Sequence, residues 1–129
     1  MKPHIFLQLC DDQNQRFFGS GPYRLLLGVE ELGSLRASAQ RMGMAYSKAL
    51  ALIRTAEQEL GFPLTCRTIG GKGGGGSTLT EGARELMMRY EAYVAACSQA
   101  CDNLFQIHFG SFDASRYSSQ TCPPQQAQP

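Results

Sequence analysis

Three neighbouring side chains, Tyr46, Ser47 and Lys48, place a phenol, a hydroxyl and an ammonium group at the start of a predicted helix. The hydroxyl and ammonium groups can hydrogen-bond to base edges or to phosphates, and the tyrosine can reach a phosphate or stack on a sugar. A helix that enters a DNA major groove by its N-terminal end presents such groups to the bases. A solvated helix start explains the same residues equally well. The surrounding elements therefore have to decide between the two interpretations.

Further cations lie on both sides of this helix start. Residues 34–76 contain six basic and two acidic residues, although the formal net charge of the whole chain is only +1. A local excess of positive charge is what contact with phosphate requires. Arg54, two turns along the helix, is expected to reach a phosphate. Ser34 and Arg36 are candidate contacts to the DNA backbone, with Arg36 as a clamp, and a plain surface arginine is the alternative for Arg36.

Two predicted helices position these side chains. Ser34 is a favourable N-cap for the first helix, which extends to about Met42, and the second helix covers residues 46–60. Gly43 can adopt the positive φ that the turn between them needs, and small residues let the helices cross closely. The positions of this helix-turn-helix spacing, at offsets 0, 4, 10 and 13, are Ala39, Gly43, Ala49 and Leu52.

A glycine-rich hairpin follows the helix pair. Residues 64–69 and 77–79 have the pattern of two short strands, and GGKGGGG with its single Lys72 lies between them. Backbone without side chains can approach DNA closely, with Lys72 in a minor groove or on a phosphate. The alternative is a mobile loop with a solvated lysine. A helix-turn-helix followed by such a hairpin predicts a winged helix.

The N-terminal residues are expected to complete this fold. Alternating side chains over residues 2–10 predict a strand, residues 16–18 predict its partner, and residues 23–32 predict a helix. The buried face of that helix is expected to contain Leu25, Leu26, Val29 and Leu32. The predicted fold class is mainly α with small β-hairpins (α+β), a winged helix-turn-helix with a long C-terminal dimerisation helix. The expected division is a DNA-binding domain at 1–79, the long helix at 80–109 and a disordered tail at 110–129.

The long helix begins after Thr80 and has a heptad pattern. Its seam alternates spacings of four and three through Ala83, Met87, Tyr90, Val94, Cys97, Cys101, Leu104 and His108. At about 1.5 Å per residue the helix is about 45 Å long, which is more than so small a domain can cover. A homodimer through this helix is therefore expected. The predicted dimerisation residues are Met87, Tyr90, Val94, Cys97, Cys101 and Leu104.

The five cysteines give little reason to expect a metal centre. Cys97 and Cys101 are four residues apart on one helix face, with His108 one heptad beyond, so a metal or redox site across a dimer is one interpretation. Packing of cysteine as a small apolar residue is the preferred one. We therefore expect neither a metal nor a cofactor. No Ser/His/Asp set and no catalytic pair of carboxylates stands out in the sequence, so an enzyme is not expected either.

The location expected for the chain is the cytoplasm. The start MKPHIFLQLCDD has too short an apolar run for a signal peptide, and the odd number of cysteines favours free thiols in a reducing compartment. No run of 18 apolar residues is present, so no membrane segment is expected.

Three stretches together resemble a known family: FGSGPYRLLLGVEELGS, AQRMGMAYSKAL and RTIGGKGGGGSTLTEGARELMMRYEAY. They are similar to the N-terminal DNA-binding domain of molybdate-responsive (ModE-type) transcriptional regulators, winged helices related to the LysR type. The resemblance covers roughly residues 2–93, and the GGKGGGG wing is its most specific part. It implies a homodimer through the long helix and a recognition helix in the major groove. By position it adds Arg67 and Thr68 to Tyr46, Ser47, Lys48 and Lys72 as DNA contacts.

The sequence departs from this family in two respects. The family often has tryptophan at the position of Leu50, which puts the local packing or a contact in doubt. Full-length members carry C-terminal molybdate-binding domains that this sequence does not contain, so the resemblance leaves open whether molybdate is sensed directly or a separate effector-binding protein supplies the signal. The sequence thus predicts a homodimeric, sequence-specific regulator of transcription that binds double-stranded DNA and is linked to molybdate or metal homeostasis. The alternative is a metal- or redox-sensing or protein-interaction module on the same fold.

Overall fold

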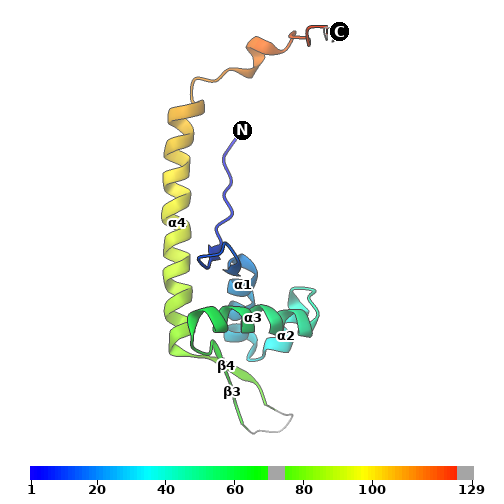
Figure 1. Cartoon of the computed structure of the whole chain (residues 1–129), viewed down its shortest axis with the longest axis vertical. Coiled ribbons are helices and arrows are strands. Elements are labelled where there is room, and N and C mark those ends of the chain that lie inside the picture. The colour runs from blue at the N-terminus through cyan, green and yellow to red at the C-terminus, as the bar shows by residue number, and fades with distance from the viewer. Residues whose placement is uncertain (70–74, 125–129) are drawn as a thin grey trace.

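The computed structural model describes residues 1–69 and 75–124. In chain order the elements are β1 (Leu9–Cys10), β2 (Arg16–Phe18), α1 (Ser20–Leu32), α2 (Leu35–Arg41), α3 (Tyr46–Leu60), β3 (Thr65–Arg67), β4 (Ser77–Leu79), α4 (Glu81–Phe109) and the 3-10 helix η1 (Ala114–Tyr117). Three short helices gather around one end of α4, and the other half of α4 extends past them (Figure 1). β1 pairs with β2 and β3 pairs with β4, both antiparallel. The predicted fold class, mainly α with small hairpins, is confirmed.

The core lies where α1, α2, α3 and the first half of α4 meet. Its buried apolar side chains are Phe18, Leu25, Leu26, Val29, Leu35, Ala39, Ala49, Ile53, Ala56, Leu64, Leu79, Ala83, Met87 and Tyr90. The predicted inner face of α1 is correct except at Leu32, which is 46% exposed. Leu32 is the last residue of α1, and Gly33 then turns the chain with a φ of 77°.

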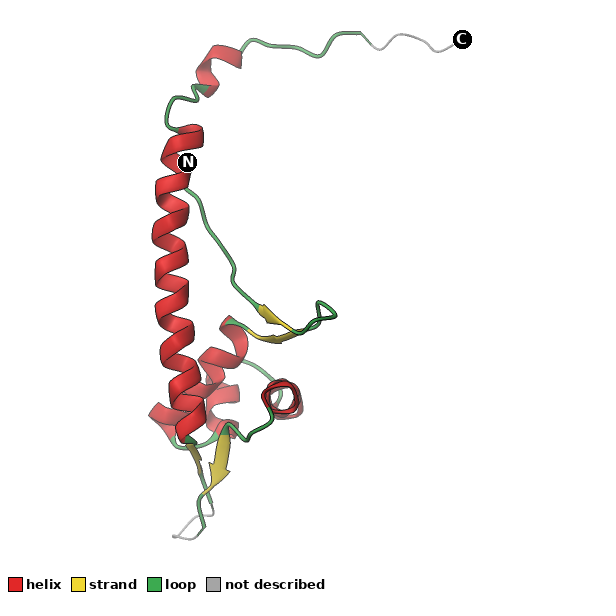
Figure 2. Ribbon diagram, turned by 60° about the vertical axis from the view of Figure 1, so that its left-hand side comes forward, coloured by secondary structure: helices red, strands yellow, loops and turns green. Residues whose placement is uncertain are grey.

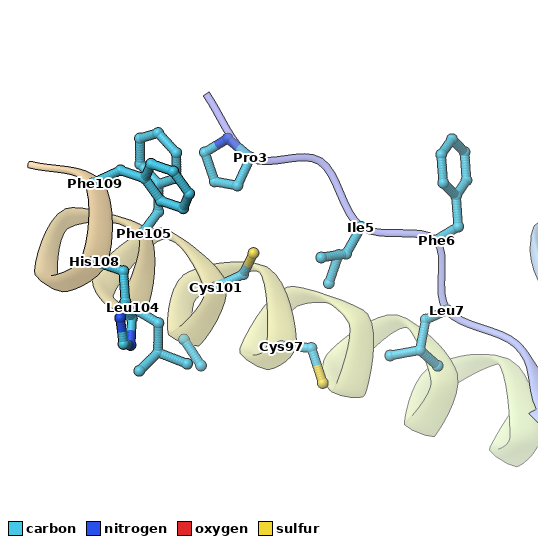
Figure 3. Close-up of a pocket in the computed structure, with 11 residues that line it drawn as sticks. Pro3, Ile5, Phe6, Leu7, Cys97, Cys101, Leu104, Phe105, His108 and Phe109 are labelled. Atoms are coloured by element: carbon cyan, nitrogen blue, oxygen red, sulfur yellow. The ribbon is translucent and has the colours of Figure 1, made fainter. Parts of the chain in front are cut away.

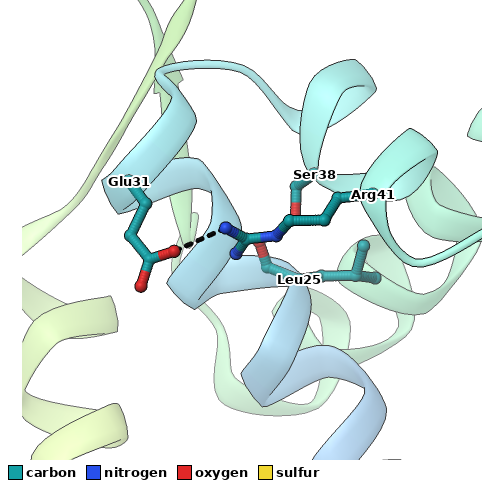
Figure 4. A network of polar contacts seen from close by, with 4 residues as sticks. All are labelled: Leu25, Glu31, Ser38 and Arg41. Carbon is teal, nitrogen blue, oxygen red and sulfur yellow. Dashed lines mark hydrogen bonds and ion pairs between the residues drawn. The ribbon is translucent and has the colours of Figure 1, made fainter.

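Helices α1 and α2 cross closely at Gly28 and Ser38. A Cβ atom at Gly28 would lie 2.0 Å from Ser38 Oγ. Ser38 is fully buried, and its hydroxyl donates a 2.7 Å hydrogen bond to the carbonyl oxygen of Leu25 (Figure 4). A buried hydroxyl needs such a partner, and α1 supplies it only because the helices approach this closely. The crossing sets where α2, and therefore α3, lies.

The predicted caps and turn are confirmed. Ser34 Oγ accepts a 2.9 Å hydrogen bond from the amide of Ala37 at the start of α2. Thr80 Oγ1 accepts a 3.1 Å hydrogen bond from the amide of Ala83 at the start of α4. Gly43, between α2 and α3, has a φ of 66°, a conformation that residues with a Cβ rarely adopt.

The hairpin β3–β4 is joined to the turn between α1 and α2. The amide of Ser77 donates a 2.7 Å hydrogen bond to the carbonyl oxygen of Gly33. A Cβ atom at Gly76 would lie 2.4 Å from the same oxygen, so glycine permits this approach. β3 is shorter than the strand predicted over 64–69. Lys72 and the rest of residues 70–74 lie outside the described residues.

The strand predicted over residues 2–10 is wrong for all but its last two residues. Residues 3–7, which we call the N-terminal strap, run along the distal half of α4 with Pro3, Ile5 and Leu7 turned toward the helix and Phe6 away (Figure 3). The hydroxyl of Tyr90 donates a 2.8 Å hydrogen bond to the carbonyl oxygen of Leu7. The period-two pattern is real, but it reflects an extended segment packed on a helix rather than a strand in a sheet.

The segment after α4 leaves the folded body (Figure 2). Described residues 110–124 are all exposed and include the single turn of η1, where the sequence analysis expected no element. Phe112 stacks on Tyr117 with ring centroids 6.4 Å apart. The expected disorder of this tail stays a prediction.

The crossing of α1 and α2 gives a first testable prediction. Gly28→Ala should lower the free energy of unfolding by about 1–3 kcal/mol, since the added methyl group forces the two helices apart. Thermal or urea unfolding measures this change. Gly21→Ala, also in α1, is the matched control, because a Cβ there meets nothing within 4 Å. It should leave stability unchanged or raise it slightly. Equal effects of the two substitutions would show that the crossing is not the constraint.

The hydrogen bond from Tyr90 to the N-terminal strap gives a second prediction, about stability at high pH. Burial raises the pKa of the Tyr90 phenol, so the unfolded chain loses this proton at lower pH than the folded chain. The stabilisation is therefore complete below pH 10, the ordinary tyrosine value, and is lost as pH rises through the folded pKa. Tyr90→Phe should cost about 1 kcal/mol at neutral pH and make stability fall less steeply above pH 10. Unfolding at several pH values measures both effects, and Tyr117→Phe in the exposed tail should change neither.

Candidate nucleic-acid interface

The exposed face of α3 includes Ser47, Ala51 and Arg54, which lie four and three residues apart. Successive residues of a helix are about 100° apart, so these three lie on one stripe. The opposite face buries Ala49 and Ile53 against the core. Ser47 and Arg54 were expected as DNA contacts. Ala51 was not, although its spacing from both of them could have indicated it.

Tyr46 lies on one flank of this stripe and borders a cleft of about 220 Å³. The guanidinium carbon of Arg36 lies 4.2 Å from the centroid of the Tyr46 ring, which is a cation–π contact. Arg67 of β3 lines the same cleft from the hairpin. Ser34, the cap of α2, lines it as well, so the fold brings together four of the predicted contact residues from α2, α3 and the wing.

Lys48 lies on the other flank of α3, because it is two residues from Tyr46 and so about 200° away around the helix. It borders a second groove of about 430 Å³ together with Arg16 of β2. Arg16 was not among the predicted contacts. Its place beside α3 depends on the tertiary fold, so local sequence patterns contain no signal for it.

Two predicted contact residues also have structural hydrogen bonds. Ser34 caps α2, and Thr68 Oγ1 accepts a 2.9 Å hydrogen bond from the amide of Gly76. In both cases the hydroxyl oxygen is an acceptor, so the hydroxyl proton stays free to donate. Lys72 lies outside the described residues, and the structure does not test its predicted role.

Two charged residues of the basic segment 34–76 have partners elsewhere in the fold. Arg41, which contributes to the basic excess, pairs with Glu31 at 2.6 Å (Figure 4). Of the two acids in the segment, Glu57 accepts a 2.7 Å hydrogen bond from the amide of Leu64 and so has a structural role. Within residues 1–69 and 75–124, no ion pair involves Arg36 or Arg67.

The residues of the predicted dimerisation seam of α4 differ in how far their own chain buries them. Met87 and Tyr90 are 8% and 7% exposed and belong to the core of their own chain. Val94 is half-buried against that core, and Cys97 and Cys101 are half-buried beneath the N-terminal strap. Only Leu104, at 54% exposure, leaves most of its side chain accessible. A heptad pattern predicts that one face of a helix is buried, but it does not show whether the same chain or a partner buries it.

A second apolar stripe of α4 lies beside that seam. It contains Leu86, Tyr93, Ala100, Leu104 and Ile107, at successive spacings of 7, 7, 4 and 3. Tyr93, Leu104 and Ile107 are 55%, 54% and 73% exposed. Leu86 and Tyr93 border a cleft of about 610 Å³ with Leu9 of β1. The sequence analysis did not identify this stripe, because both stripes are apolar and only the fold shows which is covered.

The described residues contain no group of three or more His, Cys, Asp or Glu side chains that could hold a metal ion. Cys97 and Cys101 are free thiols. No helix within the described ranges is long and apolar enough to cross a membrane.

Comparisons with known proteins agree with this geometry. The family model of the bacterial regulatory helix-turn-helix protein, lysR family, matches residues 22–88. The molybdenum transport protein ModE of Azotobacter vinelandii is 33% identical over 95 residues, which cover 70% of this chain and 35% of that protein. ModE of Herbaspirillum seropedicae is 36% identical over 81 residues, covering 63% of this chain and 28% of that protein. The chain thus spans about a third of the length of these relatives.

A solved structure supports the fold. We compared the chain with the crystal structure of a complex of the CbnR DNA-binding domain with DNA. The two structures superpose with a TM-score of 0.52 at 17% sequence identity, over 67% of this chain and 93% of that chain. The resemblance stated from the sequence is confirmed, since the ModE relatives match the N-terminal portion and the family model includes α2, α3 and the wing. The matching family is one of regulatory helix-turn-helix proteins, so the expectation that the chain is not an enzyme is confirmed too. Because the family model matches just over half of the 129 residues, the chain belongs to the LysR family of bacterial regulatory helix-turn-helix proteins.

Proposed function

We propose that this chain is a sequence-specific regulator of transcription that binds double-stranded DNA as a homodimer. The observation that carries the proposal is the exposed stripe of α3, flanked on one side by Arg36 and Arg67 and on the other by Lys48. Cations that are not paired with protein carboxylates can release counterions from DNA phosphates on binding. The membership of the chain in a regulatory helix-turn-helix family supports the same function.

The proposed DNA contacts are of two kinds, contacts to base edges and contacts to phosphates. Ser47 and Lys48, in the first turn of α3, are proposed to read base edges in the major groove, because side chains at the start of a recognition helix lie deepest in the groove. Arg54 and Arg67 are proposed to contact phosphates on either side. Lys72, by its place in the wing sequence, is proposed to touch a phosphate or the minor groove.

The second copy is proposed to pack on the exposed apolar stripe of α4. Tyr93, Leu104 and Ile107 are large side chains more than half exposed on one face, which is unfavourable for a chain alone in water. Packing two such stripes together removes them from water and places two α3 helices on one DNA molecule. The operator should then contain two half-sites related by two-fold symmetry and separated by about 10 base pairs or a multiple of it.

The signal that controls binding is proposed to concern molybdate or another metal. This proposal is supported by the name of the similar proteins, molybdenum transport protein ModE. The similarity to this chain covers only the N-terminal part of those proteins. A separate effector-binding protein is proposed as the source of the signal, and the cytoplasm as the location.

Selection of genomic DNA fragments by the purified chain tests the proposal. We expect enrichment of a palindromic site, bound more tightly than random duplex at the same salt concentration. The competing function, a metal- or redox-sensing module, predicts stoichiometric metal in the purified chain and no DNA binding even at low salt. That result would overturn the proposal.

The stripe of α3 gives a specific prediction. Ala51→Glu should weaken DNA binding by about a hundredfold or more, because a carboxylate in the middle of the stripe would face phosphates and base edges. Glutamate is a good helix former and Ala51 is exposed, so the fold should persist. Fluorescence anisotropy with labelled duplex measures the affinity. Gln106→Glu, an equal change of charge on α4, should leave it unaltered; unchanged binding by Ala51→Glu would remove α3 from the interface.

The apolar stripe of α4 gives another. Leu104→Glu should shift the chain toward monomers in sedimentation experiments, since two carboxylates would be buried in the interface. It should weaken binding to a duplex with two half-sites much more than to a single half-site. Leu104 is 54% exposed, so the protomer should stay folded. Gln106→Glu is again the control. A Leu104→Glu chain that stays dimeric would place the dimer contact elsewhere.

A further inference from the structure

We infer that the cleft between Arg36, Tyr46 and Arg67 is a binding site for one tetrahedral oxyanion. In the DNA complex the anion is a phosphodiester group, and free sulfate or inorganic phosphate competes for the same place. The inference rests on the proposed DNA binding and goes beyond it, because it assigns one phosphate to one site shared by the helix-turn-helix and the wing.

The charge of the cleft fits an anion. Two guanidinium groups line it from separate elements, Arg36 from α2 and Arg67 from β3. Its other lining residues among those described are Ser34, Leu35, Tyr46, Gly75, Gly76 and Ser77, none of which is acidic. The three ion pairs of the described chain occupy Arg41, Arg84 and Arg89 instead. The cleft therefore has two positive charges and no negative one.

The size of the cleft fits one phosphate group. Its volume of about 220 Å³ is large enough to admit a tetrahedral oxyanion. A tetrahedral oxyanion with a few bridging waters fills such a space. The hydroxyls of Ser34, Tyr46 and Ser77 at its walls can supply further donors.

Tyr46 holds one of the cations in place. The guanidinium carbon of Arg36 lies over the Tyr46 ring, 4.2 Å from its centroid, so the aromatic face contacts the guanidinium group. The N–H groups at the edge of the guanidinium plane stay free, and this planar edge is suited to two parallel hydrogen bonds to an oxyanion. Tyr46 is thus a positioning residue for Arg36, and its ring matters more than its hydroxyl.

The backbone of the wing forms the remaining wall. Thr68 and Gly76 exchange hydrogen bonds, and Ser77 is joined to Gly33 at the start of the α1–α2 turn. A Cβ at Gly76 would lie 2.4 Å from the carbonyl oxygen of Gly33, and one at Gly75 would lie 2.6 Å from that of Thr68. Both glycines permit the close approach that keeps Arg67 on the same cleft as Arg36.

The DNA experiment measures affinity for a fixed duplex over a range of chloride concentrations. Arg36→Ala and Arg67→Ala should each weaken binding by about tenfold at moderate salt and reduce the slope of log affinity against log salt by about one unit. Arg41→Ala is the matched control. It removes the same charge from the same helix as Arg36→Ala, but Arg41 pairs with Glu31 and lies outside the cleft. It should leave the slope unchanged.

Two substitutions of Tyr46 separate its ring from its hydroxyl. Tyr46→Phe keeps the aromatic face and should leave the salt slope as in the unmodified chain. Tyr46→Leu removes the face and should reproduce most of the Arg36→Ala loss. Circular dichroism and thermal unfolding identify any variant that fails to fold. Equal losses for both substitutions would show that the hydroxyl, not the positioning of Arg36, is what DNA binding requires.

An anion experiment tests the cleft without DNA. Titration of the free chain with sodium sulfate, at constant ionic strength against sodium chloride, should shift the backbone amide resonances of Arg36, Gly76 and Ser77. Arg36→Ala should abolish these shifts, and Arg41→Ala should preserve them. Sulfate should also displace DNA from the unmodified chain more than chloride does at equal ionic strength, and this difference should vanish in Arg36→Ala.

The outcomes distinguish the two proposals. DNA binding with unchanged salt slopes in Arg36→Ala and Arg67→Ala, and without sulfate shifts at the cleft, would overturn the oxyanion site and leave the regulator function intact. Sulfate shifts at the cleft without binding to any duplex would support the oxyanion site and contradict the DNA-binding function.

Discussion

The close contact between Gly28 of α1 and Ser38 of α2 is the constraint on which the rest of the structure depends. Because Gly28 has no side chain, the two helices approach until the buried Ser38 hydroxyl reaches the carbonyl oxygen of Leu25 at 2.7 Å. That contact fixes α2, the positive-φ turn at Gly43 fixes α3 relative to α2, and the outward direction of Ser47 follows. A displacement at the crossing would therefore move the stripe that is proposed to face DNA, although neither Gly28 nor Ser38 belongs to that stripe. The steric condition comes first, because the Ser38 hydroxyl can reach the carbonyl oxygen of Leu25 only if residue 28 has no side chain.

The wing is placed by the same part of the molecule. Gly33 ends α1, and its carbonyl oxygen accepts the 2.7 Å hydrogen bond from Ser77 at the start of β4. One short turn thus connects the end of α1, the cap of α2 and the base of the hairpin. This arrangement explains why Arg36 and Arg67, thirty-one residues apart, line one cleft. The first turns of α2 and α3 and the base of the hairpin consequently form one continuous surface.

The sequence predicted the parts of this structure that depend on local chemistry. Ser34 and Thr80 as caps, Gly43 in the turn and the apolar faces of α1 and α3 all follow from helix rules that operate within a few residues. The errors occur where tertiary packing decides. Alternation over residues 2–10 gives the same pattern for a strand in a sheet and for a strap on a helix, and only the fold shows that Ile5 packs on α4. In the same way, Met87 and Tyr90 satisfy a heptad pattern while packing inside their own chain. Arg16 and the pairing of Arg36 with Tyr46 required the folded structure, because neither has a local signature.

A nearly neutral chain can still present a strongly positive face if its acids are occupied elsewhere. Glu31 pairs with Arg41 and Glu30 with Arg84, and none of these four residues lines the cleft. The carboxylate of Glu57 accepts a hydrogen bond from the backbone amide of Leu64, between α3 and β3. These exposed pairs add little to stability, about 0–1 kcal/mol each. Their greater effect is on the distribution of charge, because they leave Arg36, Lys48, Arg54 and Arg67 without carboxylate partners in the described residues. The net charge of +1 therefore does not describe the charge of the surface that is proposed to bind DNA.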